Sequence, residues 1–319
     1  MAGEFDLIAR HFDWPVPPGV LGVGDDCALL PVSPGHRLAV TTDLLIEGRH
    51  FFPDVDPESL GHKALAVNVS DLAAMGARPL GCVLGLSLPV ADEAWLERFA
   101  RGFRALADSV GCPLVGGDTT RSVQGVVISV TAMGEVRAGA ALTRSAARPG
   151  DDIWVTGTLG AAHMALELAQ GRHAAYAALL EPLRADLERP RPPVAFGADL
   201  AGVAHAAIDI SDGLLQDLGH VLRASGCAAH IDYAALPAHP ALQAVDAAVV
   251  QRAVLNGGDV YQLCFTASSD ARPAITALAE RHGIRVTRVG QAAAGQGLRV
   301  SACPVPLGRD GYSGFDHFG

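Results

Sequence analysis

The stretch that decides the fold runs from Lys63 to Ala77 and reads KALAVNVSDLAAMGA. It lies in a predicted helix from Glu58 to Met75, which ends at a glycine because glycine favours helix termini. Asn68 and Asp71 are three residues apart, and Lys63 and Asp71 are eight apart. At these spacings the three side chains share one face of the helix. The sequence therefore predicts a polar, functional face, although a solvated face would show the same pattern.

Asp71 belongs to one of five short aspartate-containing clusters along the chain. Three clusters directly follow apolar runs that predict strands, namely Leu38–Val40, Pro113–Val115 and Ala206–Ile208. Strand ends are where ligand sites form in open α/β sheets. The five clusters are Gly24-Asp25-Asp26-Cys27, Thr41-Thr42-Asp43, Asn68-Val69-Ser70-Asp71, Gly116-Gly117-Asp118-Thr119-Thr120 and Asp209-Ile210-Ser211-Asp212-Gly213.

Carboxylates that converge in a fold need cations between them. Two unit charges about 4 Å apart repel by roughly 4 kcal/mol at an effective dielectric constant near 20. Hard oxygen ligands suit Mg²⁺, which commonly bridges protein carboxylates to substrate phosphates. Taken singly, Asp26 fits a turn, Asp43 and Asp212 fit helix or turn caps, and the Asp118 cluster is equally ambiguous. Their joint occurrence predicts a Mg-nucleotide or Mg-phosphate enzyme.

The composition bounds the class of protein. With 319 residues, 50% of them hydrophobic and 18% charged, the chain is globular and long enough for about two domains. The formal net charge of −10 argues against nucleic-acid or anionic-membrane binding, because both need a basic surface. No GxxxxGK[ST] loop occurs, and lysine occurs once, at Lys63. Phosphate binding must therefore use metal ions, arginine and backbone amides.

Cysteine usage and the N-terminus indicate a cytoplasmic protein. The six cysteines include no CxxC pair, which fits free thiols in a reducing compartment. Glu4 and Asp6 do not fit the basic start of a signal peptide, and no 18-residue apolar run predicts a membrane span.

The small, arginine-containing segment from Ala138 to Pro149 predicts a joint between two α/β units. We expect the first unit to span 1–137, the linker 138–149 and the second unit 150–319. The predicted strands are Cys27–Val32, Arg37–Thr42, Gly81–Leu88, Pro113–Val115, Val126–Val136, Asp152–Thr156, Ala206–Ile210, Val260–Thr266 and Arg285–Val289. The predicted helices are Gly3–Phe12, Glu58–Met75, Asp92–Ser109, Leu159–Ala169, Gly213–Ala224 and Ala271–His282.

Further polar candidates stand outside the aspartate clusters. His50 lies between Arg49 and two phenylalanines, where a structural role or a polar substrate contact both fit. Arg144 could hold a phosphate in bidentate fashion, although most arginines are simply solvated. The turn from Thr156 to Gly160 could bind an anion at a helix N-terminus, but packing explains it as well.

Read in order, these clusters resemble the thiamine-monophosphate kinase family of the aminoimidazole ribonucleotide synthetase-like superfamily. The resemblance spans almost the whole chain, and the long helix motif with the GGDTTR run is its most specific part. The matching segments are Gly3–Phe5, Gly24–Ala28, Thr41–Asp43, Gly48–Phe51, Lys63–Ala77, Gly116–Arg121, Leu142–Arg144, Asp209–Leu214 and Gly314–Phe318.

The resemblance implies an α/β (α+β) fold of two domains. An N-terminal mixed sheet with helices would dimerise and bind Mg-ATP, and a C-terminal α/β domain would follow. It implies ATP-dependent phosphorylation of thiamine monophosphate to thiamine diphosphate, the last step of that biosynthesis, by a cytoplasmic homodimer with several Mg²⁺ ions. The implied metal ligands are Asp26, Thr41, Thr42, Asp43, Asp71, Asp118, Asp209 and Asp212. The implied ATP-binding residues are Gly117, Asp118, Arg144 and Ser211, the substrate-binding residues are His50, Asp259 and Phe315, and the catalytic residues are Asp43, Asp71 and Arg144.

One motif departs from the family pattern. The family has GGEDYEL before its late strand, whereas this chain has Gly257-Gly258-Asp259-Val260-Tyr261-Gln262-Leu263. If the family glutamate contacts the substrate, Asp259 must reach about one methylene further. Two alternatives stay open: a sibling enzyme acting on another phosphate substrate, and a weakly catalytic protein that binds thiamine phosphate or nucleotide.

Overall fold

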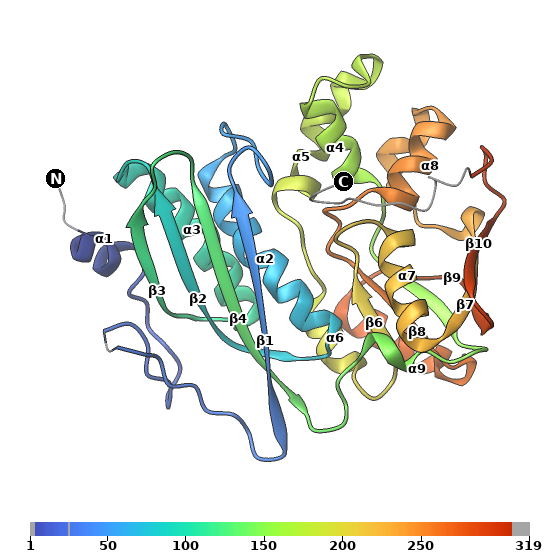
Figure 1. The fold of residues 1–319 in the computed structure, drawn as a ribbon, viewed down its shortest axis with the longest axis horizontal. Helices are drawn as coiled ribbons and strands as arrows, with labels where there is room; N and C mark the ends of the chain where they lie inside the picture. The colour runs from blue at the N-terminus through green and yellow to red at the C-terminus, as the bar shows by residue number, and fades with distance from the viewer. Residues whose placement is uncertain (1–3, 25, 308–319) are drawn as a thin grey trace. The chain divides into compact units, whose positions relative to one another are not determined.

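The computed structural model describes residues 4–24 and 26–307 (Figure 1). The chain divides into two compact units. Unit 1 contains the described residues up to Leu72 together with Ala77–Gly139, and unit 2 contains Ala73–Gly76 and the described residues from Ala140 onward. Among the helices of the described residues, none is long and apolar enough to cross a bilayer.

Unit 1 is a four-stranded mixed sheet in the order β1-β4-β2-β3, with helices on one face (Figure 1). β4 pairs antiparallel with both β1 and β2, and β2 pairs parallel with β3. Its elements are α1 (Glu4–His11), β1 (His36–Ile46), α2 (Pro57–Ala74), β2 (Arg78–Leu88), α3 (Glu93–Val110), β3 (Leu114–Arg121) and β4 (Val127–Arg137).

Two glycines let α2 and α3 cross at close range. A Cβ atom at Gly61 would lie 2.0 Å from the carbonyl oxygen of Phe99, and one at Gly102 would lie 1.8 Å from the carbonyl oxygen of Glu58. Neither contact leaves room for a side chain, so the sequence fixes how near the helices approach. Phe99 and Phe103 of α3 are fully buried in this layer.

Strands β1 and β3 of unit 1 extend beyond the apolar runs from which strands were predicted. β1 continues through Thr41–Asp43, and β3 continues through the Gly116–Thr120 cluster. The expectation that these clusters lie at strand ends was therefore wrong, because ladder pairing with β4 and β2 carries the polar residues along. The predicted strand Cys27–Val32 is also wrong, since the structure has there only an isolated bridge between Leu21 and Leu29.

Unit 2 is built on a six-stranded mixed sheet in the order β10-β7-β9-β5-β8-β6. Its strands are β5 (Asp152–Thr156), β6 (Ala206–Asp209), β7 (Cys227–Asp232), β8 (Leu263–Ala267), β9 (Val286–Ala294) and β10 (Gly297–Ser301). Its α-helices are α4 (Ala161–Ala169), α5 (Leu180–Glu188), α6 (Val194–Leu200), α7 (Leu214–Ser225), α8 (Ala247–Asn256) and α9 (Arg272–His282). Its 3₁₀-helices are η1 (Arg144–Ala146), η2 (Ala174–Leu179), η3 (Tyr233–Ala235), η4 (Pro240–Ala244) and η5 (Ser269–Ala271).

The core of unit 2 packs α7 against its sheet. Leu214 and Leu218 of α7 are fully buried with Ile153 and Val155 of β5. β6 ends at Asp209, so in this unit the aspartate cluster does follow its strand directly. The strands β7 and β10 and the helices α5, α6 and α8 were not predicted, because their short or alanine-rich sequences carry little periodic signal.

Candidate functional site

In unit 1 two carboxylates are held between β1 and α2. The hydroxyl of Thr41 donates a hydrogen bond to Asp71 Oδ2. The backbone N–H of Asp43 donates to Asn68 Oδ1 at 3.0 Å, and Asn68 Nδ2 donates to the carbonyl oxygen of Ala64 at 3.1 Å. Thr41 and Asp43 are two residues apart on β1, so their side chains point to the same face of the sheet, toward the helix layer. The structure thus brings together Thr41, Asp43 and Asp71, as the sequence predicted.

The electrostatics of this pair are those of a cation site. Burial and, to a smaller extent, the neighbouring charge of Asp71 together raise the pKa of Asp43 from its ordinary value of 3.8 to about 6. The cluster offers two carboxylates and a hydroxyl, which are the hard oxygen donors that Mg²⁺ prefers. A divalent cation would lower the repulsion between the two carboxylates, so the residues present fit the metal.

Other unit 1 candidates lie apart from this cluster. The hydroxyl of Thr42 donates to the carbonyl oxygen of Val130 at 3.1 Å, because strand alternation turns its side chain to the opposite face. Asp118 is exposed on β3, at the far edge of the sheet from β1. Its neighbour Gly117 must be glycine, since a Cβ there would lie 2.0 Å from the carbonyl oxygen of Leu84. Asp26 is exposed in a bend between α1 and β1.

His50 lies in the turn that follows β1. Its Nδ1 accepts a hydrogen bond from the backbone N–H of Ile46 at 3.0 Å. Nδ1 is therefore unprotonated, and the neutral ring carries its proton on Nε2. In this tautomer the hydrogen-bond donor of the ring is Nε2.

In unit 2 the loop Asp209–Gly213 is organised by a residue that sequence reasoning missed. Asp217 Oδ2 accepts hydrogen bonds from the backbone N–H groups of Ser211, Asp212 and Gly213 at 3.1, 3.1 and 3.0 Å. The pKa of Asp217 is raised to about 7, because burial and the charge of Asp212 outweigh the lowering by the three amides. The signal available in the sequence was an acidic residue in the first turn of a helix that follows a loop.

A second loop, Gly257–Gln262, runs alongside the first. Tyr261 N–H donates to the carbonyl oxygen of Ile210 at 2.8 Å, and Ile210 N–H donates to that of Gln262 at 2.8 Å. Asp259 N–H donates to the carbonyl oxygen of Ser211 at 2.9 Å. A Cβ at Gly258 would lie 2.4 Å from that same oxygen, so the contact requires glycine. These bonds bring Asp259 beside Ser211.

The conformation and hydrogen bonds of the loop Gly257–Gln262 explain part of its departure from the family sequence. Asp259 and Tyr261 adopt φ angles of 58° and 53°, which non-glycine residues rarely adopt. Tyr261 Oη donates to Asp259 Oδ1 at 3.2 Å. Gln262 accepts from Thr156 Oγ1 at 2.7 Å and donates to the carbonyl oxygen of Arg191 at 3.0 Å. A glutamate could not make the second of these bonds, so the amide suits its surroundings.

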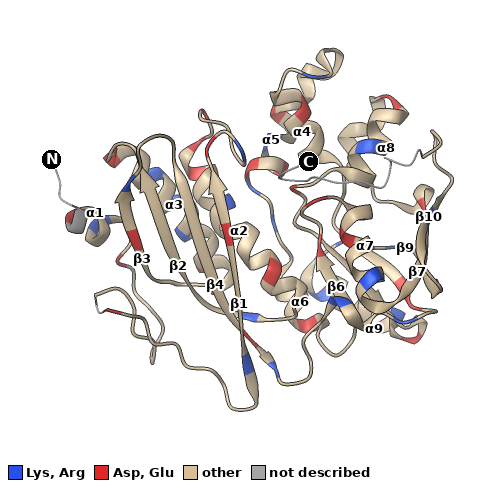
Figure 2. Ribbon diagram, viewed as in Figure 1, with Lys and Arg blue, Asp and Glu red and all other residues tan. Residues whose placement is uncertain are grey.

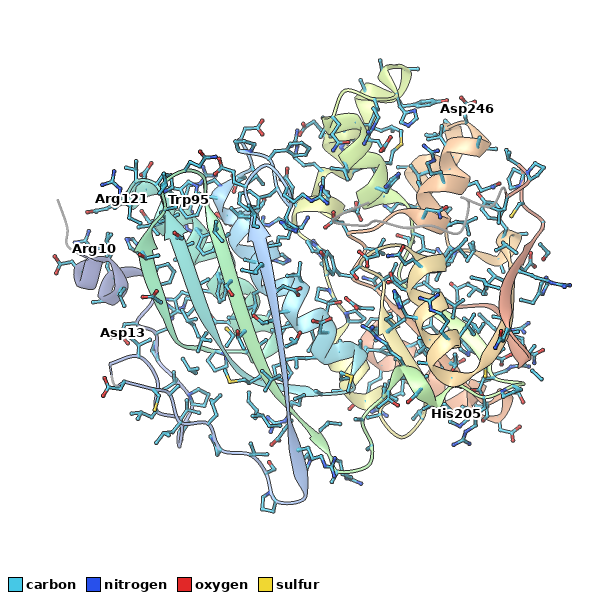
Figure 3. All side chains as sticks on the ribbon, viewed as in Figure 1. Arg10, Asp13, Trp95, Arg121, His205 and Asp246 are labelled. Atoms are coloured by element: carbon cyan, nitrogen blue, oxygen red, sulfur yellow. The ribbon has the colours of Figure 1, made fainter. Side chains whose placement is uncertain are left out.

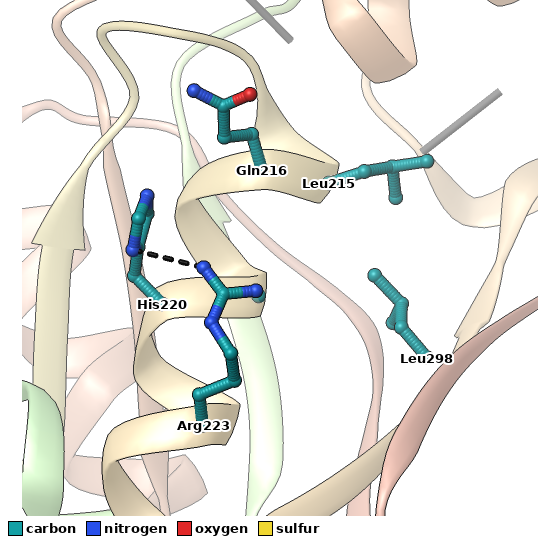
Figure 4. A pocket seen from close by; sticks show the side chains of 6 residues that line it. Leu215, Gln216, His220, Arg223 and Leu298 are labelled. Carbon is teal, nitrogen blue, oxygen red and sulfur yellow. Dashed lines mark hydrogen bonds between the residues drawn. The ribbon is translucent and has the colours of Figure 1, made fainter. Parts of the chain in front are cut away.

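Arg144 begins η1, and its backbone is tied to the end of α7. Ser225 Oγ donates to the carbonyl oxygen of Arg144 at 2.8 Å, and the Arg144 side chain is exposed. The face of α7 carries a cavity of about 410 Å³ (Figure 4). Arg223 Nη2 donates to His220 Nδ1 at 3.0 Å in this cavity. Burial lowers the pKa of His220, as do the charges of Arg223 and Arg144. The cavity is lined by Leu215, Gln216, Gly219, His220, Arg223 and Leu298.

The structure therefore brings together part of the predicted site: Thr41, Asp43 and Asp71 in unit 1, and the loop Asp209–Gly213 with Asp259 in unit 2. It does not bring Asp26, Thr42 or Asp118 to the unit 1 cluster. Acidic residues, red in Figure 2, mark β1, α2 and the end of β6. Across residues 4–24 and 26–307 no three His, Cys, Asp or Glu side chains are close enough to form a metal cage by themselves. Each group offers a partial set of oxygen donors. Phe315 lies outside the described residues.

Two family models match the chain. "AIR synthase related protein, N-terminal domain" matches residues 24–136, and "AIR synthase related protein, C-terminal domain" matches residues 148–303. Thiamine-monophosphate kinase from Escherichia coli (strain K12) is 44% identical over 322 residues, covering 99% of this chain and 98% of that protein. Thiamine-monophosphate kinase from Salmonella typhimurium is 43% identical over 328 residues, with the same coverage.

Solved structures show the same likeness. Thiamine-monophosphate kinase from Stenotrophomonas maltophilia K279a superposes with a TM-score of 0.84 at 47% identity, covering 94% of this chain and 95% of that one. AaThiL complexed with AMPPCP and TMP superposes with a TM-score of 0.76 at 31% identity, covering 99% of this chain and 97% of that one.

Proposed function

The chain belongs to the thiamine-monophosphate kinase family, and from this premise we propose that it transfers the γ-phosphoryl group of ATP to thiamine monophosphate. The products are thiamine diphosphate and ADP, and the reaction is the last step of thiamine diphosphate biosynthesis. The relative complexed with AMPPCP and TMP supports both substrates. The observation in this chain that carries the proposal is the Thr41–Asp43–Asp71 oxygen cluster, with the raised pKa of Asp43.

We propose in-line transfer without a covalent intermediate. The phosphate of thiamine monophosphate is already anionic, so the nucleophile needs no strong general base. Positioning and charge neutralisation then carry the catalysis. Asp43 and Asp71 hold Mg²⁺, which neutralises phosphate charge when bound, and Arg144 adds a fixed positive charge. The other proposed metal ligands are Asp26, Thr41, Asp118, Asp209 and Asp212. Thr42, also implied by the resemblance, is left out because its hydroxyl donates to Val130 on the opposite face.

The remaining contacts divide between nucleotide and acceptor. Gly117, Asp118, Arg144 and Ser211 contact ATP, Gly117 because it lets the backbone approach a phosphate closely. His50 donates from Nε2 to the phosphate of the acceptor. Asp259 approaches the thiamine moiety, and its shorter side chain is held by the hydroxyl of Tyr261. Phe315 completes the acceptor site.

We also propose that the chain acts as a homodimer through the outer face of β1. Leu38, Val40, Leu44 and Ile46 alternate along this edge strand and are 42–59% exposed. Large apolar side chains that gather on one exposed face favour burial against a partner. Under this proposal residues 1–137 form the dimerising, Mg-ATP-binding domain, 138–149 the linker and 150–319 the second domain. The six free thiols support a cytoplasmic location.

An assay of the purified protein with ATP, Mg²⁺ and thiamine monophosphate tests the proposal. Formation of thiamine diphosphate supports the kinase, and loss of product in excess EDTA supports its metal dependence. Binding of thiamine monophosphate without turnover would instead favour the binding protein. No binding of thiamine monophosphate would favour a sibling enzyme. Asp259→Glu, which restores the family residue, measures how far the shorter side chain changes KM for thiamine monophosphate.

A further inference from the structure

We propose that Asp217 is a positioning residue that orients the Asp209–Gly213 loop for binding of Mg-nucleotide. Its carboxylate occupies the anion position of the loop, and the loop is left to act through the oxygen atoms of Asp209, Ser211 and Asp212. The inference rests on the proposed function, because it concerns how this loop meets a Mg-nucleotide.

The geometry is that of an internal anion bound to a nest of amides. A single oxygen, Asp217 Oδ2, accepts from three successive backbone N–H groups at 3.0–3.1 Å. Asp217 is 3% exposed. Its own N–H donates to the carbonyl oxygen of Gly213 at 3.0 Å, which closes the first turn of α7. The loop and the helix are therefore joined at both the backbone and the side chain of one residue.

Such a position ordinarily attracts a phosphate. Successive amides that converge at a helix N-terminus form an anion site, and the helix dipole adds to the attraction. In this chain the protein's own carboxylate satisfies all three amides, so none of them is left to donate to a nucleotide. With its amides turned toward Asp217, the loop keeps the side chains of Ser211 and Asp212 partly exposed.

Other hydrogen bonds hold the Asp209–Gly213 loop in the same orientation. Gln216 Nε2 donates to Asp212 Oδ2 at 3.3 Å from the same turn of α7. On the other side, Asp259 and Tyr261 donate their N–H groups to the carbonyl oxygens of Ser211 and Ile210. Removal of Asp217 would release the amides while the carbonyl side of the loop stays held. We therefore expect the loop to lose its orientation without loss of the neighbouring strands.

Asp217→Ala and Asp217→Asn test the inference. Binding of Mn²⁺ and of Mg-AMPPCP is measured by titration calorimetry, alongside kcat and KM. We expect Asp217→Ala to bind both ligands at least about 10-fold more weakly and to lose up to about 100-fold in kcat, since small misplacements cost that much. Asp217→Asn keeps an acceptor oxygen in the nest and should recover most of the affinity. Added formate, which can fill the vacated position, should partly restore Asp217→Ala.

The matched control is Asp151→Ala. Asp151 is also 3% exposed, and its carboxylate accepts from the backbone N–H of Arg148 at 2.9 Å and contacts His205, which is labelled in Figure 3. Its loss should lower the melting temperature without changing Mn²⁺ or AMPPCP affinity. If Asp217→Ala does not fold, Asp217→Ser, with a single remaining acceptor, takes its place.

Two results would overturn the inference. One is a folded Asp217→Ala protein with wild-type affinity for Mn²⁺ and Mg-AMPPCP, and the other is a loss of affinity no larger than that of Asp151→Ala. Failure of the proposed function is distinguishable, because it would show in the wild-type protein as binding of Mg-AMPPCP without formation of thiamine diphosphate.

Discussion

The two groups of site residues are held in different ways. In unit 1, Asp43 and Asp71 lie on a regular strand and a regular helix, and side chains join them through Thr41 and Asn68. In unit 2, the loops Asp209–Gly213 and Gly257–Gln262 are irregular, and backbone hydrogen bonds join them. The first group therefore depends on which side chains are present. The second depends on where glycine permits close contact and on the single carboxylate of Asp217.

The difference has consequences for substitution. Replacing a carboxylate in unit 1 changes charge while the pairing of β1 with β4 and the backbone of α2 stay intact. Placing a methyl group in the unit 2 loops moves the backbone itself, and with it every donor on the loop.

Asp71→Asn should lower kcat by about 1,000-fold, the upper range for removing one group that stabilises transition-state charge. The amide still accepts from the Thr41 hydroxyl, so the fold should survive, as checked by circular dichroism and melting. Asp92→Asn is the control, because Asp92 caps α3 at an exposed position. A variant with near-normal turnover would remove Asp71 from the mechanism.

Gly258→Ala should reduce kcat by about 10- to 100-fold by misplacing the loop. The added Cβ would lie 2.4 Å from the carbonyl oxygen of Ser211, and backbone atoms cannot give way as a flexible side chain can. Gly226→Ala, whose Cβ would meet nothing within 4 Å but whose φ of 65° favours glycine, measures the cost of backbone strain away from the loops. Equal kinetic losses in both variants would count against a backbone-held site.

Asp43→Asn should stabilise the metal-free protein at pH 7 while abolishing activity. The folded pKa of Asp43 is raised from 3.8 to about 6, so the folded state holds this proton more tightly than the unfolded state does. The wild-type protein therefore loses stability as pH rises through this window, by about 3 kcal/mol once complete. In EDTA the variant should melt a few degrees higher at pH 7, with no difference below pH 4. A lower melting temperature at pH 7 would contradict the repulsion between Asp43 and Asp71.

Tyr261→Phe should have the smallest effect, a rise of about 3-fold in KM for thiamine monophosphate with kcat nearly unchanged. The substitution removes a single hydrogen bond to Asp259, of the order of 1 kcal/mol, and leaves the backbone pairing of the loops in place. Tyr176→Phe, which removes a hydroxyl bonded to the N–H of Asp246, is the control. A large fall in kcat would mean that the side chain of Asp259 does more than bind the acceptor.

Much of unit 1 could be predicted from the sequence because its signals are periodic. The residue spacing placed Lys63, Asn68 and Asp71 on one helix, and the predicted helix from Glu58 differs from α2 by a single residue at either end. The strand ends were missed because polar residues such as Thr41 and Asp118 are tolerated within a paired ladder, which local propensity does not register.

The loops of unit 2 were harder for a physical reason. The aspartates of the Asp209–Gly213 loop were recognisable as a motif. No local sequence pattern indicated that Asp217 accepts hydrogen bonds from three backbone amides of that loop. Likewise the pairing of Asp259 with Ser211 joins residues 48 positions apart along the chain. Such contacts depend on tertiary packing, and a single sequence contains no period that reports them.

The burial of Lys63 has a practical consequence. It is the single lysine in the chain and is 4% exposed within α2. Amine-acylating reagents can reach its ammonium group only when that helix opens. The rate at which Lys63 is acetylated therefore reports how often α2, which also carries Asp71, opens. Mass spectrometry can measure this rate without an engineered probe.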